Sequence, residues 1–345
     1  MANFDFTYTF LNREKLPLLI QPTSERQANV DTLIHFLNEE NAFFKEQLLQ
    51  YGAIRFHGFH VNSAEQFAAV ISACSLGMLF NYDLCAVPRT KIQEGIYTSI
   101  NIHESFSVPM HNEKSYDPEF PNYIFFNSLK TPGFGGNTPL ADGHKIWLSL
   151  PDSLQQKLEA KGMLYRHFFY GKGLRQRFVR LIGKGLNCRT WMSAFQTEDK
   201  NELEKILHTL NLQFRWTSKG NGLITERTLP ACRRHPINNK VVWFNQAAHN
   251  NLYYNKSFVA INRTVKNPIA RFILSHRSFL PYVVFYGDGE PISKKEADLM
   301  HFAIKKNIVS TSWQVGDLMV VDNYSCMHGK EPHKGERLLL AAMTK

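Results

Sequence analysis

Short segments rich in β-branched and aromatic residues recur along the chain, and they constrain its fold most. Seven such segments are candidate strands, at residues 53–59, 95–100, 123–126, 241–244, 282–286, 317–321 and 338–343. Turns rich in Gly, Asn and Asp separate several of them, and their apolar residues do not alternate strictly with polar ones. Many short strands with flanking helices favour a central barrel or jelly roll over a doubly wound sheet.

Helical segments are predicted between these strands. A long helix is predicted at about residues 29–50, ending near Gly52. Three further helix starts carry capping patterns ahead of an apolar stripe: Ser63 with Gln66, Thr197, and Ser293 with Glu296.

No phosphate-binding or dinucleotide-binding glycine motif occurs in the required context, which disfavours both nucleotide-binding classes.

Composition indicates a folded protein with a substantial core. Of the 345 residues, 43% are hydrophobic and 13% are aromatic, and no run approaches the roughly 18 apolar residues of a membrane span. The N-terminus lacks a signal-peptide layout, and five cysteines without a C-x-x-C pair indicate reduced thiols. We therefore expect a cytoplasmic protein without membrane contact. We expect a single domain over residues 1–345, with residues 1–50 as an N-terminal extension and helix packed on the barrel.

The positive charge is concentrated in two parts of the chain. The net charge is +10, and residues 161–189 carry eight basic side chains with no acid. Residues 227–287 carry nine more, again with no acid. Such patches indicate an anionic partner or substrate, or else a basic face that aids solubility. A nucleic-acid-binding protein is an alternative, but no recognition motif of that class is present.

His111-Asn112-Glu113 is a candidate pair of metal ligands. Residues i and i+2 of a strand project from the same face, so both side chains could bind one ion. A third ligand from a distant strand would complete a two-histidine, one-carboxylate site with open positions for substrate and O2. In a chain of this composition about one such triplet is expected by chance, so the flanking sequence decides its meaning.

The flanking segments resemble the taurine dioxygenase (TauD/TfdA) superfamily of 2-oxoglutarate oxygenases, in its SyrP-like, clavaminate-synthase-related branch. The matching segments stand in the family's order over roughly residues 50–345, and their combination is specific. They are GAIRFHGF, IYTS, VPMHNEKSY, GGNTPLADG, WMSAFQTEDK, RHP, VVWFNQ, YGDGEPI and WQVGDLMVVDNYSCMHGKEPHKGERLLLAAM.

This resemblance implies an α+β protein with a mainly β core, a double-stranded β-helix with flanking helices. It implies Fe(II) at His111, Glu113 and His328, with 2-oxoglutarate and O2 as cosubstrates. Arg337 matches the arginine that pairs with the distal carboxylate of 2-oxoglutarate, and Thr138 matches the hydroxyl that assists it. A guanidinium suits this task because its planar fork matches a carboxylate.

The same resemblance bears on the reaction and on the substrate. Halogenating relatives lack the carboxylate ligand, so Glu113 favours hydroxylation, desaturation or ring formation. Relatives act on small acids and on amino acids, free or tethered to a carrier protein. A non-catalytic relative serving as a binding module is the alternative, which the intact ligand set disfavours.

Two further groups of residues are candidates for contacts with the substrate or a partner. Asn245 and Gln246 could orient the substrate, or could serve only as hydrogen-bonding residues at a sheet end. The basic segment, residues 161–189, is predicted to dock an acidic carrier protein or to steer an anionic substrate, through Arg175, Arg177 and Arg180.

Overall fold

A computed structural model describes residues 4–80, 89–99, 103–173, 176, 177, 179, 181, 189–217, 221–276 and 280–345. Two compact units are separated by their internal contacts. The first unit comprises Met1–Ser149, Arg233–Phe244 and Ile304–Lys345, and the second comprises Leu150–Cys232 and Asn245–Ala303. The single domain over residues 1–345 stays a prediction.

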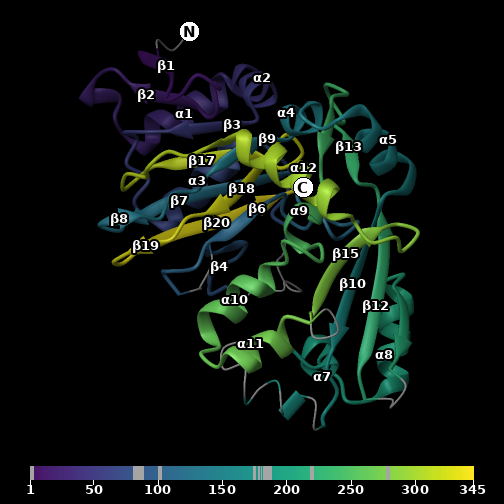
Figure 1. The fold of residues 1–345 in the computed structure, drawn as a ribbon. Helices are drawn as coiled ribbons and strands as arrows, with labels where there is room; N and C mark the ends of the chain where they lie inside the picture. The colour runs from purple at the N-terminus through teal and green to yellow at the C-terminus, as the bar shows by residue number, and fades with distance from the viewer. Residues whose placement is uncertain are drawn as a thin grey trace. The chain divides into compact units, whose positions relative to one another are not determined.

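An eight-stranded sheet forms the larger layer of the first unit (Figure 1). Neighbouring strands are antiparallel except for the parallel pair β2 and β3. In spatial order the strands are β1 (Phe6–Phe10), β2 (Leu18–Pro22), β3 (Ala53–Phe56), β17 (Leu318–Asp322), β7 (Tyr123–Lys130), β20 (Leu338–Thr344), β5 (Ile96–Thr98) and β4 (Lys91–Gln93).

A four-stranded sheet forms the second layer of this unit. Its strands, in spatial order, are β16 (Ile308–Val309), β9 (Leu140–Asp142), β18 (Cys326–Lys330) and β6 (Val108–His111). Two short ribbons complete the unit, β8 (Phe134–Gly135) with β19 (His333–Lys334) and β13 (Cys232–Arg234) with β14 (Val241–Trp243). The first residue of β13, Cys232, is assigned to the second unit, and the rest of that ribbon to the first.

Side chains of the large sheet divide between two cores because successive residues of a strand point to opposite faces. Phe126 of β7, with Met319 and Val321 of β17, joins Leu140 and Cys326 of the smaller sheet in one cluster. This cluster fills the space between the two sheets, as in a double-stranded β-helix. Covering both faces explains why the predicted strands read as continuous apolar runs rather than as alternating ones.

Three helices cover the outer face of the large sheet. Phe125 and Val320 point to that face and pack against Phe36 and Phe44 of the helices. The helices are α1 (Val30–Glu39), α2 (Asn41–Tyr51) and α3 (Ala64–Cys74), and a 3-10 turn at Glu25–Gln27 precedes them. Helix α4 (Gly143–Leu148) also belongs to the first unit.

The predicted helix at 29–50 is wrong in one respect, because it is two helices with a break at Glu40. The Asn41 side chain donates to the carbonyl oxygens of Leu37 (3.0 Å) and Cys74 (3.1 Å), which ties the break to the end of α3. The predicted end is confirmed, since Gly52 adopts a left-handed conformation (φ 76°) after α2. Ser63 is confirmed as the cap of α3.

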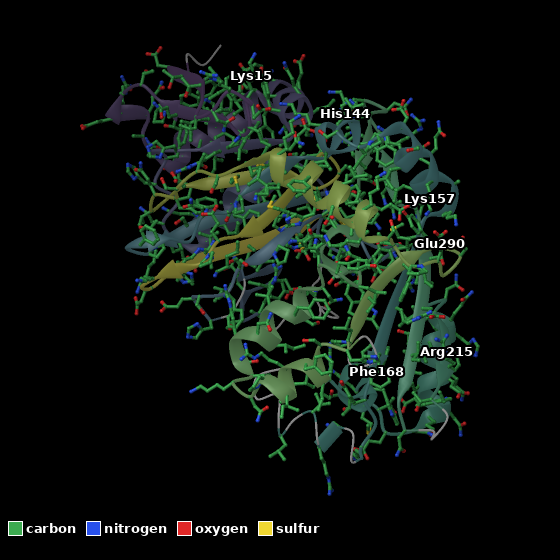
Figure 2. The ribbon with its side chains drawn as sticks, in the orientation of Figure 1. Lys15, His144, Lys157, Phe168, Arg215 and Glu290 are labelled. Atoms are coloured by element: carbon green, nitrogen blue, oxygen red, sulfur yellow. The ribbon has the colours of Figure 1, made fainter. Side chains whose placement is uncertain are left out.

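The second unit contains a four-stranded antiparallel sheet and most of the other helices. Its strands, in spatial order, are β11 (Gln213–Trp216), β12 (Leu223–Leu229), β10 (Met163–Phe169) and β15 (Tyr282–Tyr286). The helices are α5 (Asp152–Lys161), α7 (Trp191–Phe195), α8 (Lys200–Thr209), α9 (Ala247–Asn250), α10 (Lys256–Thr264), α11 (Pro268–Leu274) and α12 (Lys294–Lys306), the last of which ends in the first unit. In Figure 2, Lys157 of α5 lies near Glu290, and its ammonium is 2.8 Å from that carboxylate.

Of the caps predicted for α8 and α12, the first is wrong and the second is confirmed. Asp199, not Thr197, caps α8, because its carboxylate accepts the Asn201 backbone N–H at 2.8 Å. The Thr197 hydroxyl instead accepts the Asp199 backbone N–H at 3.2 Å, just ahead of the helix. The capping box of α12 is confirmed, since Ser293 and Glu296 exchange hydrogen bonds between side chains and backbone N–H groups. Among the described residues, no helix combines the length and hydrophobicity needed to cross a bilayer.

Candidate metal centre

Antiparallel pairing brings two histidines from distant parts of the chain together. His111, the last residue of β6, lies directly opposite His328 of β18 in the ladder. Their ring centroids are 4.4 Å apart. Opposite residues of an antiparallel pair are the closest neighbours that two strands can offer. The register of β6 on β18 therefore creates the histidine pair.

Glu113 reaches the same point from a loop. The prediction that His111 and Glu113 share a strand face is wrong, because β6 ends at His111. The buried Asn323 holds the loop instead: its amide oxygen accepts the Glu113 N–H at 2.7 Å and its amide nitrogen donates to the Glu113 carbonyl at 3.1 Å. One nitrogen or oxygen from each of His111, Glu113 and His328 lies within 4.8 Å of the others.

Hydrogen bonding and burial prepare these groups to bind a cation. The Nδ1 of His111 donates to the Pro109 carbonyl at 2.9 Å, so Nε2 is the nitrogen that carries the lone pair for a metal ion. Burial, and then the neighbouring His111, hold the pKa of His328 well below its usual range, so its ring is neutral. Among the described residues, no hydrogen-bond partner reaches the buried Nδ1 of His328. The donor set therefore fits a divalent ion of the iron class.

A basic side chain that sequence analysis missed contacts the carboxylate. The Arg89 guanidinium lies 3.1 Å from Glu113 Oε2, and both side chains are buried. The second carboxylate contact is longer, 3.9 Å from Glu113 Oε2 to His328 Nε2. No sequence motif includes Arg89, and the residues between Arg89 and Glu113 do not indicate that the two side chains meet.

A small cationic pocket adjoins the histidine pair. His111, His328, Thr138, Lys330 and Arg337 all line it. Arg337 donates to the Gly136 carbonyl at 2.8 Å, and its Nη2 lies 3.5 Å from the Thr138 hydroxyl. Burial lowers the pKa of Arg337 to about 10, a value at which the group remains charged at neutral pH. The structure thus brings the two predicted cosubstrate-binding residues together.

Lys330 adds a second cation that sequence analysis missed. Its side chain is buried, and its ammonium donates to the Phe106 carbonyl at 3.1 Å. Burial, and then the charge of Arg337, lower the pKa of Lys330 to about 8. A signal for it was present, because Lys330 follows His328 by two residues and so shares its face of β18.

Asn245 and Gln246 lie in the second unit and are engaged in local hydrogen bonds. Asn245 is fully buried, donates to the Ala231 carbonyl at 2.6 Å and accepts the Ala247 N–H at 2.8 Å. The Gln246 side-chain oxygen accepts from Asn250 at 3.1 Å. These contacts match the alternative of hydrogen bonding at a sheet end, and the substrate role stays a prediction.

The basic segment is less uniformly cationic than its sequence indicates. Arg177 is exposed, whereas Arg175 and Arg180 lie outside the described residues. Acids from distant segments pair with three of its basic residues: Lys161 with Asp288 and Glu290, Arg166 with Glu226, and Lys172 with Glu198. The prediction that the whole segment lacks acidic neighbours is therefore wrong.

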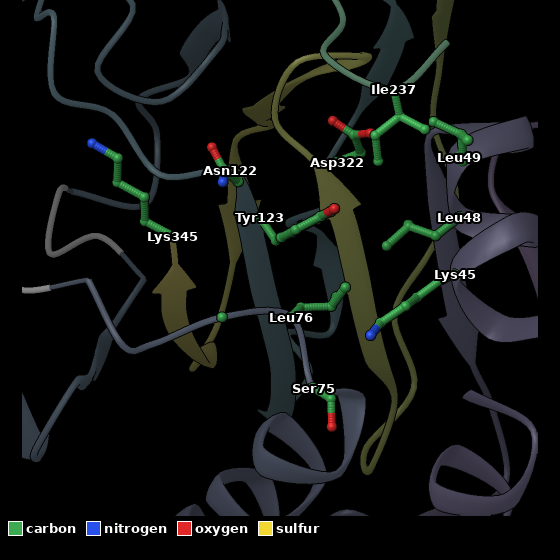
Figure 3. A pocket seen from close by; sticks show the side chains of 11 residues that line it. Lys45, Leu48, Leu49, Ser75, Leu76, Asn122, Tyr123, Ile237, Asp322 and Lys345 are labelled. Carbon is green, nitrogen blue, oxygen red and sulfur yellow. The ribbon is translucent and has the colours of Figure 1, made fainter. Parts of the chain in front are cut away.

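A larger cavity of about 310 Å³ lies elsewhere in the first unit (Figure 3). Leu48 of α2 and Tyr123 of β7 line it, with Lys45 and Lys345 among its polar groups. None of its lining residues belongs to the His111–Glu113–His328 cluster. Cavity size therefore does not identify the reactive site, whereas the chemistry of the His111, Glu113 and His328 side chains does.

Comparison with known families identifies the class of protein. The model of the family described as "Taurine catabolism dioxygenase TauD, TfdA family" matches residues 13–343. The chain belongs to this family of dioxygenases that use Fe(II), 2-oxoglutarate and O2. This membership confirms the expected enzyme class and the expected cosubstrates.

Individual relatives agree with this assignment. The dapdiamide synthesis protein DdaC of Enterobacter agglomerans is 29% identical over 300 residues, covering 86% of this chain and 83% of its own. A clavaminate synthase-like protein of Arabidopsis thaliana is 28% identical over 341 residues, covering 96% and 88%.

Solved structures confirm the double-stranded β-helix fold. PvcB of Pseudomonas aeruginosa matches with a TM-score of 0.54 at 14% identity, over 100% of this chain and 93% of that chain. AAD-2, solved with Mn(II) and N-oxalylglycine, matches with a TM-score of 0.53 at 12% identity, over 100% and 97%. At such low identity these likenesses concern the fold alone.

Proposed function

We propose that this oxygenase oxidises an unactivated C–H bond of a small, amino-acid-like substrate at an iron ion bound by His111, Glu113 and His328. The convergence of these three side chains carries the proposal. Two imidazoles and a carboxylate, with donor atoms within 4.8 Å of one another, are the ligand types of non-haem Fe(II) oxygenases. Among the described residues, no other group of three His, Cys, Asp or Glu side chains meets this geometry.

The pocket beside the cluster suits the distal carboxylate of 2-oxoglutarate. Arg337 and Thr138 provide a charged fork and a hydroxyl, and Lys330 adds a second positive charge. A buried anion is stable only when charge and hydrogen bonds replace its hydration. The reacting end of the cosubstrate would then point toward His111 and His328, which line the same pocket.

The bound iron and 2-oxoglutarate would supply the oxidising power when O2 reacts, and the protein supplies position. The Pro109 carbonyl orients the His111 ring by accepting a hydrogen bond from Nδ1, so Nε2 would be the metal-binding nitrogen. Arg89 contacts one oxygen of Glu113 and so can orient the carboxylate. The Asn323 hydrogen bonds hold the Glu113 backbone against the segment that follows β17.

The substrate class is inferred from charge and from relatives. Two similar proteins are described as taking part in synthetic pathways, one of dapdiamide and one of an isonitrile. The exposed Arg177 lies in a segment with no acid of its own, which suits an anionic substrate or an acidic carrier protein that presents one. Glu113 favours hydroxylation over halogenation, because a carboxylate occupies the place where a halide would bind.

A succinate-release assay tests this function. Protein loaded anaerobically with Fe(II) is mixed with 2-oxoglutarate and O2, and a library of free amino acids and carrier-bound aminoacyl groups is screened. At least one substrate should raise succinate release above the substrate-free rate, and mass spectrometry should show one added oxygen in the product. Absence of succinate under every condition would contradict the enzymatic proposal. Stimulation by carrier-bound groups alone would assign the carrier-tethered class.

A further inference from the structure

The Thr138 hydroxyl is contacted by two groups that can only donate hydrogen bonds. The indole Nε1 of Trp313 lies 3.1 Å from Thr138 Oγ1, and Arg337 Nη2 lies 3.5 Å from it. A threonine hydroxyl has two acceptor positions and one hydrogen, whereas indole and guanidinium N–H groups are donors only. With both acceptor positions engaged, the hydroxyl hydrogen remains to be donated to a third group.

The position of Thr138 decides where that hydrogen can go. Its side chain is 5% exposed, so bulk water is not its natural partner. It lines the same small pocket as Arg337, Lys330 and His328. The occupant of this pocket must therefore be an acceptor, as a carboxylate is.

Trp313 is held in place by a buried ion pair. The Arg55 guanidinium lies 5.6 Å from the centre of the indole ring, within the range of a cation–π contact. Arg55 is paired with the fully buried Asp317. The Asp317 carboxylate also accepts the backbone N–H of Gln314 at 2.6 Å, so one group fixes both the ring and the neighbouring backbone.

We propose that Trp313 is a positioning residue for the cosubstrate: its indole N–H occupies an acceptor position of Thr138 and so directs the Thr138 hydroxyl hydrogen toward the distal carboxylate. This inference rests on the proposed function, because it takes Thr138 and Arg337 as the binding site of 2-oxoglutarate. It assigns to Trp313 a role that requires no contact with the cosubstrate.

A double-mutant cycle on binding affinity tests the proposal. The affinity for 2-oxoglutarate is measured by calorimetry with Mn(II) in place of Fe(II), so no turnover is involved. Trp313→Phe keeps an aromatic ring and removes the N–H, and it should weaken binding about 3- to 10-fold, as for one lost neutral hydrogen bond. Thr138→Val removes the hydroxyl and keeps a side chain of similar size. In the Thr138→Val background, Trp313→Phe should then have no further effect.

Controls separate this role from simple packing. Val309 packs against the same core cluster as Trp313. Val309→Ala should therefore lower stability while leaving the affinity for 2-oxoglutarate unchanged. In steady-state assays, Trp313→Phe should raise KM for 2-oxoglutarate with kcat unchanged. If Trp313→Phe does not fold, Trp313→Leu provides a second variant without the N–H.

The outcomes that overturn the proposal differ from those that overturn the function. If wild-type protein with Mn(II) does not bind 2-oxoglutarate, the proposed function fails and the inference fails with it. If wild type binds and Trp313→Phe binds equally well, only the role of Trp313 is wrong. An equal loss in the presence and absence of the Thr138 hydroxyl would also reject it, since Trp313 would then act through packing.

Discussion

Each of the three candidate ligands is held by a different local contact. His111 is oriented by the Pro109 carbonyl, Glu113 contacts Arg89, and His328 is buried at its place in β18. A side chain that is already oriented loses little freedom when it binds an ion, so this arrangement favours tight binding. The metal-binding contribution of each residue can therefore be measured by single substitutions.

Glu113→Gln should reduce iron affinity by at least about 100-fold, because losing a ligand costs more than the 10- to 100-fold of losing a supporting residue. The amide has nearly the same size and keeps the backbone contacts with Asn323, so folding should persist. The measurement is an anaerobic Fe(II) titration, together with the visible band expected when 2-oxoglutarate is added. His103→Ala, which removes an exposed histidine outside the cluster, is the control. Unchanged iron affinity in Glu113→Gln would reject the carboxylate as a ligand.

Arg337→Gln should raise the KM for 2-oxoglutarate about 10- to 1,000-fold, equivalent to roughly 1.4–4 kcal/mol for a lost charge-assisted pair. Lys330 is expected to retain part of the attraction, because this basic residue lines the same pocket. Steady-state kinetics with varied 2-oxoglutarate measures the effect. Lys334→Gln removes an exposed positive charge nearby and should leave the KM unchanged. Equal values for wild type and Arg337→Gln would point to a different anchor.

At the scale of the elements, Glu113 is positioned beside His111 by a loop that the Asn323 side chain holds, and not by the strand that was predicted. Asn323 lies just after β17, and its side chain bridges to the loop that follows β6. Two strands of different sheets are thereby connected beside the histidine pair. The position of Glu113 depends on this bridge and not on strand alternation.

Asn323→Ala should therefore affect both stability and the metal. Removing the amide leaves the buried Glu113 N–H without its partner, a loss of about 1–3 kcal/mol in the free energy of unfolding. Iron affinity should fall about 10- to 100-fold, as for other residues that orient ligands. Urea denaturation of the metal-free protein and an Fe(II) titration measure the two effects.

Asn41→Ala is the matched control for this prediction. Asn41 also bonds backbone carbonyls through its amide, but it does so between the outer helices. Its loss should lower stability without changing iron affinity. If the two variants changed iron affinity equally, the effect of Asn323 would be one of general stability.

At the scale of the whole molecule, tertiary structure redistributes the charge. Three cations of the basic segment pair with acids from other elements. Of the predicted docking set, Arg177 is described and exposed. Charges of one sign without nearby partners attract an oppositely charged molecule over about a Debye length. Steering of a substrate or carrier should then depend on salt.

Charge reversal of Arg175, Arg177 and Arg180 to Glu should lower kcat/KM at low ionic strength, and the deficit should shrink as salt is added. Reversal of Arg13, Arg26 and Lys205 changes the net charge equally from outside the acid-free segments and should have a smaller effect. Steady-state assays over a range of NaCl concentrations provide the measurement. A flat salt dependence in wild type and in both variants would retire the docking role and leave the oxygenase class intact.

The sequence by itself determined the features that depend on near neighbours along the chain. Strands at 123–126 and 338–343 were predictable from residue type, and the caps at Ser63 and Ser293 from spacing. Such features involve interactions within a few residues, which the order of amino acids specifies directly. The types of the candidate ligands were also readable, because donor chemistry belongs to the side chain itself.

Only the tertiary structure decided the features that join distant segments. The break at Glu40 and the pairing of Lys161 with Asp288 depend on contacts between elements far apart in sequence. The same is true of the Asn323 bridge to Glu113 and the Trp313 contact with Thr138. These contacts exist because the packed sheets bring their partners within hydrogen-bonding distance, and residue order alone does not specify which distant groups will meet.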